Sequence, residues 1–374
     1  MKFDFVIVGA GLTGCTIAEY LASHTNKNIL IVEQRNHIAG NCYDFRDEHN
    51  IMVHKYGPHI FHTKRKKVWD YLSKFTEWEY YEHNVLGNIE GQLVPIPFNL
   101  VSLKKCFLGE TANRIEKKLL DKFEYGTKIP ILELRSYNDK DFEFLYNYVY
   151  KNVFEGYTKK QWGVELTELS KSVSERIPVF ISHDCRYFQD QYQAMPRNGY
   201  TSLCQNMLRH KNIHLLLSTD YFSIKSQLDC DKIIYSGKID TFFDYKYGYL
   251  PYRDLDFEFI YYDVDKYQPV AQVNYPNNND FTRITEFIHF YKKSNAKGTV
   301  IAKEYSKEHD PNNNLAPFYP MPTAHSELIA DKYFELAKSL NNVVFAGRLG
   351  DYKYYNMDDS VYRALEIAEF LVNC

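Results

Sequence analysis

The chain has 374 residues and a formal net charge of −3, with 45 basic and 48 acidic side chains. This length allows two or three domains with sizeable cores, and the near-balanced charge argues against nucleic acid or an anionic membrane as a partner. The seven cysteines are scattered and form no C-x-x-C pair, which favours reduced thiols in a cytoplasmic protein and disfavours a metal site. The first residues enter a predicted strand at once, and no apolar run approaches about 18 residues. We therefore expect neither a signal peptide nor a transmembrane helix.

A glycine-rich turn near the N-terminus carries the strongest local signal. The apolar run 3–8 predicts a buried parallel strand, residues 9–14 follow as G-x-G-x-x-G, and a helix is predicted to begin near Leu12. A second apolar strand, 28–32, ends at Glu33. The distance from the last glycine of the motif is 33 − 14 = 19 residues, close to the spacing of about 20 in dinucleotide-binding folds.

Each residue type in this motif has a physical role. Gly9 allows a tight turn, Gly11 lets backbone N–H groups approach a pyrophosphate, and Gly14 lets the helix pack closely on the strand. The helix N-terminus adds free N–H donors and a partial positive charge. Glu33 accepts hydrogen bonds from ribose hydroxyls and would repel a 2′-phosphate, so the motif predicts a dinucleotide with a free ribose.

The α/β pattern breaks near Tyr80 and resumes near Tyr200. Up to position 236 the predicted elements are a strand at 51–56, a helix at 66–75, edge strands within 80–97, helices between 100 and 163, a strand at 186–196, a helix at 200–210, and strands at 213–218 and 232–236. Beyond it, period-two alternation predicts an antiparallel sheet from 257–264, 271–275, 282–291 and 298–305, followed by a helix at 330–340, a strand at 343–346 and a helix at 360–372.

Six separated motifs stand in one order along the chain. They are 9–14 with Glu33, 57–63 (Gly-Pro-His-Ile-Phe-His-Thr), 157–162 (Tyr-Thr-Lys-Lys-Gln-Trp), 176–179 (Arg-Ile-Pro-Val), 282–286 (Thr-Arg-Ile-Thr-Glu), and 347–349 (Gly-Arg-Leu) with Tyr354. In residue type, order and spacing this set resembles the bacterial UDP-galactopyranose mutases, which are FAD enzymes. The resemblance covers the chain from end to end.

The resemblance implies an isomerase that interconverts UDP-galactopyranose and UDP-galactofuranose without net redox change. In such enzymes N5 of reduced FAD attacks the anomeric carbon and UDP leaves. The flavin-bound sugar then opens to an iminium and recloses as the other ring, and UDP recaptures it. The resemblance further implies an external reductant for the flavin, a homodimer, and a role in cell-surface polysaccharide biosynthesis.

The fold implied is α/β, with a Rossmann-like FAD-binding domain, a helical insertion and an antiparallel β-sheet substrate domain. We expect the FAD-binding domain to comprise 1–80, 195–245 and 325–374. The helical domain would comprise 81–185, with a mobile substrate loop at 166–175, and the sheet domain 186–194 and 246–324. The polar composition of the loop at 166–175 predicts that it closes over the diphosphate when UDP binds.

Two arginines and two histidines are the expected catalytic residues. Arg176 and Arg283 stand at motif positions that contact the diphosphate, where guanidinium groups form bidentate bonds to phosphate oxygens as charge builds on the leaving group. His59 and His62 stand where the family places histidines beside the isoalloxazine, to tune the reduced flavin or relay a proton.

The resemblance also assigns binding residues. Those for substrate are Asn84, Phe154, Tyr157, Thr158, Trp162, Arg176, Tyr187, Asn274, Arg283, Tyr319, Tyr354 and Asn356, with Tyr157 stacking on uracil and Trp162 bordering the sugar and diphosphate. Those for FAD are Gly9, Gly11, Leu12, Thr13, Gly14, Glu33, Gln34, Arg35, Gly40, Asn41, His59, Ile60, Arg348, Met357 and Asp358.

Two positions depart from the family pattern. Many relatives carry Asp where this chain has Asn356, which keeps the hydrogen-bonding capacity of the side chain but removes a charge. Ala39 stands where a second glycine is usual before Gly40, and we expect this change to have little effect.

Other functions remain open on the sequence alone. A mutase acting also on UDP-N-acetylgalactosamine is one alternative, because a loop change could admit a 2-acetamido group, and His59 is the residue whose variation would test it. An amine-oxidase-like flavoenzyme would leave the two motif arginines without a role. A nicotinamide dehydrogenase needs a separate catalytic domain after a compact parallel sheet, and a non-catalytic nucleotide-binding module leaves motifs 157–162 and 282–286 unused.

Overall fold

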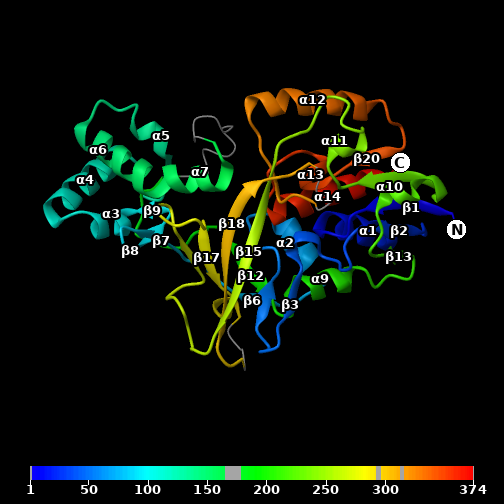
Figure 1. Ribbon diagram of the computed structural model, residues 1–374, viewed down its shortest axis with the longest axis horizontal. Coiled ribbons are helices and arrows are strands. Elements are labelled where there is room, and N and C mark those ends of the chain that lie inside the picture. Colours follow the sequence, from blue (N-terminus) through cyan, green and yellow to red (C-terminus); the bar gives the residue numbers. More distant parts are fainter. Residues whose placement is uncertain (1, 165–177, 292–295, 312–315, 374) are drawn as a thin grey trace.

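The computed structural model describes residues 2–164, 178–291, 296–311 and 316–373. Figure 1 shows three regions: a parallel sheet with helices on the right, a helical lobe at the upper left, and long strands of a second sheet running between them. Among the helices formed by the described residues, none has the length and apolar character that a membrane crossing requires.

The parallel sheet forms from the segments that the sequence predicted. Its order is β13-β2-β1-β14-β20, with β1 at Phe3–Val8, β2 at Ile29–Val32, β13 at Ile213–Leu216, β14 at Cys230–Tyr235 and β20 at Val343–Phe345. Helices α1 (Leu12–His24) and α14 (Met357–Val372) pack together on one face, and α12 (Ala324–Lys338) covers the other. Successive side chains of β1 serve opposite faces: Ile7 joins the α1 and α14 side, and Val6 the α12 side. Both faces are buried, which explains the continuous apolar runs in the sequence.

The second sheet has seven strands in the order β19-β15-β18-β17-β16-β7-β8. These are β7 (Val85–Ile89), β8 (Gln92–Ile96), β15 (Tyr252–Tyr262), β16 (Gln272–Asn274), β17 (Arg283–Glu286), β18 (Thr299–Glu308) and β19 (Tyr319–Pro320). The sheet is antiparallel except that β16 pairs with β7 in parallel. The hairpin 85–96, which the sequence grouped with the helical domain, therefore extends this sheet, and β8 forms its edge while β7 does not.

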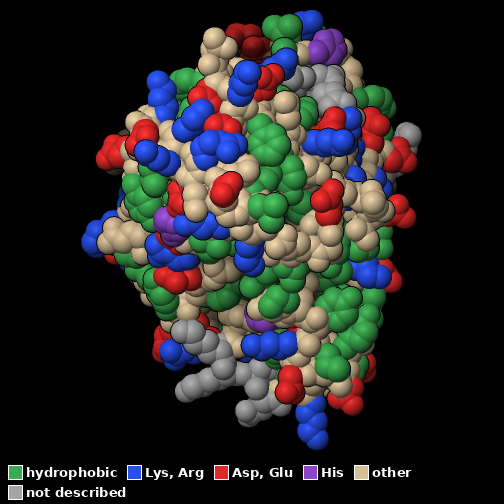
Figure 2. Space-filling view, turned by 90° about the vertical axis from the view of Figure 1, so that its left-hand side faces the viewer, with side chains coloured by type: hydrophobic (Ala, Val, Ile, Leu, Met, Phe, Trp, Pro, Cys, Tyr) green, Lys and Arg blue, Asp and Glu red, His purple; other side chains and the backbone are tan. Residues whose placement is uncertain are grey.

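The helical lobe contains α3 (Leu100–Cys106), α4 (Gly109–Lys122), α5 (Ile131–Leu134), α6 (Lys140–Val149), a π-helical turn at Tyr150–Glu155, and α7 (Gly156–Trp162). A small sheet of β9 (Phe98–Asn99), β10 (Lys128–Pro130) and β11 (Pro178–Phe180) closes it. Its apolar core joins these helices to β7 and β8 through residues such as Val85, Leu119 and Leu145. Figure 2 views the molecule from this side and shows basic and acidic side chains interspersed over the surface.

Shorter elements connect these regions. They are β3 (Asp44–Arg46), β4 (Met52–His54), β5 (Phe61–Thr63), α2 (Lys66–Leu72), β6 (Trp78–Tyr80), β12 (Tyr192–Pro196), α9 (Gly199–Met207), α10 (Tyr221–Ile224), α11 (Ile239–Phe242) and α13 (Gly347–Gly350), with 3-10 turns at Gly40–Cys42, Lys225–Gln227 and Phe287–Phe290. Several predicted strands were too long, and two of them differ most from the structure. The strand predicted at 186–196 begins at Tyr192, and the one predicted at 282–291 ends at Glu286, where the chain turns into the 3-10 helix.

Candidate active site

The glycine-rich turn has the geometry that its residue types predicted. Gly9 has φ of +101°, in the region that favours glycine. A Cβ at Gly14 would lie 2.0 Å from the carbonyl oxygen of Gly9, so helix α1 packs directly against the turn and tolerates no side chain there. A Cβ at Gly11 would meet its nearest neighbour, the Cα of Gly40, at 3.8 Å. Gly11 lines a pocket, and a side chain at this position would not clash with the backbone. The space in front of Gly11 is therefore open to a ligand.

The N-terminus of α1 opens into this pocket. Its N-cap is Gly11, and its first turn reads Leu12-Thr13-Gly14, which are uncharged residues. Leu12 and Thr13 both line the pocket. The first N–H groups of a helix have no intrahelical acceptor, so this end of α1 offers donors and a partial positive charge to an anion such as a pyrophosphate.

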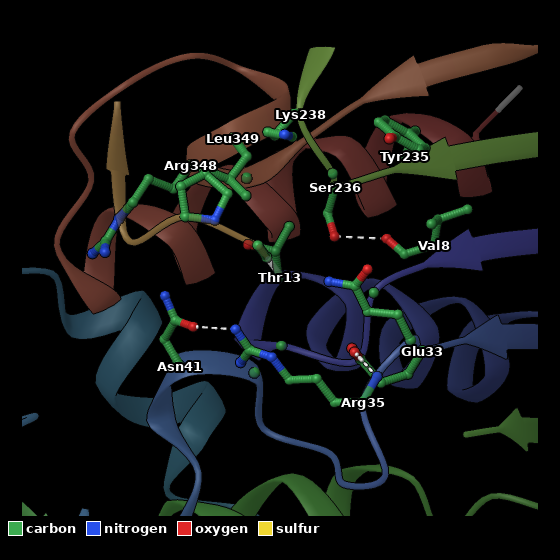
Figure 3. Close-up of a pocket in the computed structure, with 18 of the residues that line it drawn as sticks. Val8, Thr13, Glu33, Arg35, Asn41, Tyr235, Ser236, Lys238, Arg348 and Leu349 are labelled. Atoms are coloured by element: carbon green, nitrogen blue, oxygen red, sulfur yellow. Dashed lines mark hydrogen bonds between the residues drawn. The ribbon is translucent and has the colours of Figure 1, made fainter. Parts of the chain in front are cut away.

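Glu33 and Arg35 form the floor of the pocket at the end of β2 (Figure 3). The Glu33 carboxylate accepts hydrogen bonds from the backbone N–H groups of Ala10 (2.7 Å) and Arg35 (2.8 Å), one on each oxygen. Each oxygen keeps a further lone pair for a ribose hydroxyl. The Arg35 guanidinium donates to Asn41 Oδ1 at 2.9 Å and lies over the ring of Tyr56, which holds it at the pocket edge.

Most of the predicted cofactor residues line this one pocket. They are Gly9, Gly11, Leu12, Thr13, Glu33, Gln34, Arg35, Gly40, Asn41, His59, Arg348 and Met357. Gly14, Ile60 and Asp358 lie within the described residues but outside the lining. The Asp358 carboxylate instead accepts from Thr63 Oγ1 (2.9 Å) and Arg65 Nη1 (2.7 Å), which ties the start of α14 to the end of β5. Whether any of these residues contacts a cofactor stays a prediction.

Motif analysis missed several parts of the pocket wall, and two of them are segments at strand ends. Each follows the carboxyl end of a parallel strand, where ligands bind in open α/β sheets. After β13 come 219–222, and after β14 come 236–238. Figure 3 shows Ser236 and Lys238 facing Thr13 and Glu33 across the pocket. The strands were predicted correctly, so their shared carboxyl edge was the signal that could have identified these residues.

Ala39, which stands where a glycine is usual, has a left-handed backbone conformation. Its φ is +71°, in the left-handed region, where a residue with a Cβ is disfavoured by about 1 kcal/mol. The conformation is held because the Ala39 N–H donates to the Ala10 carbonyl at 2.8 Å and the side chain is buried. The replacement of a glycine at this position therefore carries a cost in backbone strain.

His59 contacts the pocket as a neutral ring. Its Nδ1 lies 2.9 Å from the Gly57 carbonyl oxygen, so Nδ1 carries the proton and Nε2 is an acceptor. Its backbone N–H donates to His54 Nδ1 at 3.1 Å. Burial lowers the pKa of His59 to about 3, with further lowering from nearby His54, so the ring stays uncharged at neutral pH.

His62 lies outside the pocket lining and forms a pair with an acidic residue. Its Nδ1 is 2.5 Å from Asp190 Oδ2, and its ring stacks on Phe188 with 3.6 Å between centroids. The hydrogen bond from His62 lowers the pKa of Asp190. This geometry fixes the imidazole, and its catalytic role stays a prediction.

Two buried histidines predict acid sensitivity. His54 and His83 are 0% and 2% exposed, and burial lowers the pKa of each to about 3, against 6.5 for an ordinary imidazole. Below about pH 6.5 the unfolded chain binds these protons while the folded chain does not, so stability falls as the pH falls. Each should remove about 1.4 kcal/mol of unfolding free energy per pH unit in that window, measured by urea denaturation. His54→Asn, which keeps an acceptor for the His59 N–H, should show a shallower slope. If the variant and the wild type showed the same slope of unfolding free energy against pH, the lowered pKa of His54 would be contradicted.

An aromatic cluster borders the cofactor pocket. The ring centroid of Trp162 lies 6.3 Å from that of Tyr319 and 5.5 Å from that of Tyr354, and the two tyrosines are 5.1 Å apart. The Arg348 guanidinium, which lines the pocket, lies 5.0 Å from the Tyr319 ring and 5.7 Å from the Tyr354 ring. Residues predicted to bind substrate are therefore next to residues predicted to bind cofactor.

Arg283 is the fixed cation of this cluster. Its Nε donates to Glu304 Oε2 at 2.8 Å, its Nη2 forms an ion pair with the same oxygen at 2.7 Å, and the Glu304 side chain is 2% exposed. Burial alone would lower the pKa of Arg283, but Glu304 raises it well above its ordinary value. Tyr157 lies close enough that Arg283 lowers its pKa, although burial raises it more. The guanidinium is thus held in one orientation, with Nη1 not engaged by Glu304.

The other predicted substrate residues have varied surroundings. Phe154 is in the core of the helical lobe, and the Thr158 hydroxyl is buried without a hydrogen-bond partner among the described residues. Asn274 Oδ1 accepts from Gln272, Asn84 forms an isolated bridge with Arg186, and the Tyr187 ring packs edge-on against Phe188. Asn356 is the N-cap of α14, a position where Asn and Asp are equally suited. Arg176 and the loop at 166–175 lie outside the described residues.

The chain is similar in sequence to known proteins. The family model for UDP-galactopyranose mutase matches residues 152–354, and a model of an NAD(P)-binding Rossmann-like domain matches 7–75. A Klebsiella pneumoniae protein named "Probable UDP-galactopyranose mutase" is 38% identical, over 98% of this chain and 94% of that protein. A dTDP-fucopyranose mutase of Escherichia coli is 36% identical, over 98% of both chains.

The fold is also shared with a solved structure. A crystal structure of reduced UDP-galactopyranose mutase matches with a TM-score of 0.72 and 16% identity, over 100% of this chain and 94% of that one. The sequence relatives and the family model each extend over more than half of the chain. The chain belongs to the UDP-galactopyranose mutase family, a flavin-dependent family of isomerases.

Proposed function

We propose that this protein interconverts UDP-galactopyranose and UDP-galactofuranose, with FAD in the pocket at the carboxyl edge of the parallel sheet. The observation that carries the proposal is the contact between two sites. Arg348 lines the dinucleotide pocket and lies against Tyr319 and Tyr354, which belong to the cluster around Arg283. A nucleotide-sugar held by that cluster would have its sugar next to the cofactor.

The pocket residues fit a flavin dinucleotide. The N-terminus of α1 would take the pyrophosphate, Glu33 the adenosine ribose, and Met357 with His59 the wall beside the ring system. When bound in its reduced form, the flavin supplies an N5 nucleophile for the anomeric carbon, and an external reductant would maintain that form. The His59 Nε2, an uncharged acceptor, is suited to accept a hydrogen bond at this wall while the ring stays neutral.

The substrate cluster would stabilise the departing nucleotide. Arg283 is oriented by Glu304 before substrate arrives, so its free donors can meet charge as it develops on the diphosphate without reorganising. The phenols of Tyr319 and Tyr354 can donate further hydrogen bonds to phosphate oxygens. Trp162, which is 7% exposed, helps to exclude water from the reacting sugar.

A second candidate is a mutase for a dTDP-linked sugar. It is favoured by the dTDP-fucopyranose mutase relative, whose 36% identity is close to the 38% of the Klebsiella pneumoniae relative. The two candidates share the sugar ring interconversion and the diphosphate, and they differ in the nucleoside and in the sugar substituents. The same fold and cofactor would therefore serve both.

A substrate panel tests the proposal. Enzyme with reduced flavin is incubated with UDP-galactopyranose, UDP-N-acetylgalactosamine and dTDP-fucopyranose, and products are separated by chromatography. We expect UDP-galactofuranose as the main product and tighter binding of UDP than of dTDP. Turnover of the dTDP sugar without turnover of either UDP sugar would favour the second candidate, and turnover of none would reject both.

A further inference from the structure

The turn between β16 and β17 sets the spacing of two predicted substrate residues. Asn274 ends β16, Arg283 begins β17, and the two are directly opposite in the antiparallel register. The Tyr275 N–H donates to the Thr282 carbonyl at 2.8 Å, which closes the hairpin. Besides the pairing of Arg283 with Glu304 on β18, the turn 275–282 is therefore the connection through which α7 can influence the position of Arg283.

One lysine of α7 occupies the centre of this turn. The Lys160 ammonium donates to the carbonyl oxygens of Tyr275, Asn277 (3.2 Å), Asn279 (3.0 Å) and Phe281 (3.2 Å). An ammonium group has three N–H donors, so four converging carbonyls satisfy it completely and share its charge. Without the cation these carbonyl dipoles would face one another with no donor between them.

Helix α7 approaches the same turn with its backbone. A Cβ at Gly156 would lie 2.2 Å from the Pro276 carbonyl oxygen, so the helix and the turn are in direct contact. Gly156 and Lys160 are four residues apart and share one face of α7. At the other end of the helix Arg253 donates to the carbonyls of Gln161 (3.0 Å) and Lys160 (3.2 Å). The helix is thus attached to the seven-stranded sheet along its length.

We propose that Lys160 is a positioning residue for the nucleotide-sugar site. It fastens the turn 275–282 to α7. Arg283 on the sheet and Tyr157 on the helix therefore keep the separation at which one nucleoside diphosphate contacts both, with its diphosphate at Arg283 and its base at Tyr157. Lys160 itself does not line the cofactor pocket, and it acts through Arg283 and Tyr157. The inference rests on the proposed function for the identity of the ligand.

The test compares uncharged and charged replacements of Lys160. Lys160→Met should raise the Kd for UDP and the KM for the UDP-sugar about ten-fold, while kcat at saturation stays within about three-fold. Lys160→Arg, which also donates to carbonyls, should restore most of the affinity. Lys151→Met is the matched control, because Lys151 is exposed on the turn of helix that precedes α7. Flavin content and thermal midpoint are measured for every variant.

The outcomes separate a positioning role from a general structural one. Unchanged UDP affinity in folded Lys160→Met protein, or an affinity loss that Lys160→Arg fails to reduce, would overturn the proposal. If Lys160→Met does not fold, Lys160→Gln is used, and it must also raise KM more than it lowers kcat. Wild-type protein that turns over no UDP-sugar would reject the proposed function. In that case the Kd for UDP, measured for the wild type and the Lys160 variants, would still decide the role of Lys160.

Discussion

Replacing Arg283 with Ala should reduce kcat about 10²- to 10³-fold, because a preoriented donor to the leaving diphosphate is lost. Flavin content should stay at the wild-type level, since Arg283 lies outside the cofactor pocket lining. The measurement is steady-state turnover of UDP-galactofuranose together with the flavin absorbance of the purified variant.

The effect of the Arg283 variant on stability must be separated from its effect on turnover, because Arg283 has a buried acidic partner. The single variant leaves the Glu304 carboxylate, 2% exposed, without its counter-charge, which destabilises a fold by about 3–5 kcal/mol. The double variant Arg283→Ala with Glu304→Gln removes that charge and should show the same loss of turnover with better stability. Arg114→Ala, which removes the ion pair between an exposed arginine and Asp141, is the matched control. Near-normal turnover of the double variant would mean that other residues stabilise the diphosphate.

Replacing Gly11 with Val should yield folded, colourless protein. Gly11 has an ordinary φ of −76°, and a Cβ added there would meet its nearest neighbour at 3.8 Å, so the protein can accommodate a side chain. The added methyl groups would occupy the space in front of the α1 N-terminus, where the pyrophosphate is proposed to bind. The ratio of flavin to protein absorbance measures the effect, and circular dichroism measures folding.

Gly14→Val is the informative contrast. The Cβ at this position would lie 2.0 Å from the Gly9 carbonyl oxygen, so the variant should fail to fold rather than fold without cofactor. Folded Gly11→Val protein that retains one flavin per chain would contradict the placement of the pyrophosphate at this turn.

Local periodicity was enough to predict the nucleotide-binding unit. The strand at 3–8, the helix from Leu12 and the strand ending before Glu33 form as expected because each carries its own hydrophobic pattern and its own turn chemistry. The final helix also forms, although it begins at Met357 rather than at Ser360. Its first turn contains the polar residues Asp358, Asp359 and Ser360. The apolar periodicity therefore predicted a start too far along the chain.

Long-range pairing could not be predicted in the same way. The parallel pairing of β7 with β16 joins Val85 to Gln272, and nothing in the sequence near either strand indicates the partner. The chain after Glu286 alternates like a strand but forms a 3-10 helix, in which Phe287 and Phe290 are buried in the core. Tertiary packing decided the conformation there over local preference.

The candidate site was predicted from motifs, and its supporting residues were not. The arginine at 283 stands in a recognisable motif, whereas Glu304 orients it from the neighbouring strand β18 and was not singled out. Lys160 belongs to a motif, but its partners are backbone carbonyls, which have no signature in the side-chain sequence. Residues that act through other residues are identified from contacts rather than from sequence patterns.

The most direct test of the central claim is the amount of product formed per reductant. Enzyme with oxidised flavin should convert no UDP-galactopyranose, and dithionite should switch the activity on. Because the isomerisation involves no net electron transfer, many product molecules should form for each equivalent of dithionite consumed. Activity in fully oxidised enzyme, or consumption of reductant in proportion to product, would contradict a redox-neutral mutase and support an oxidoreductase instead.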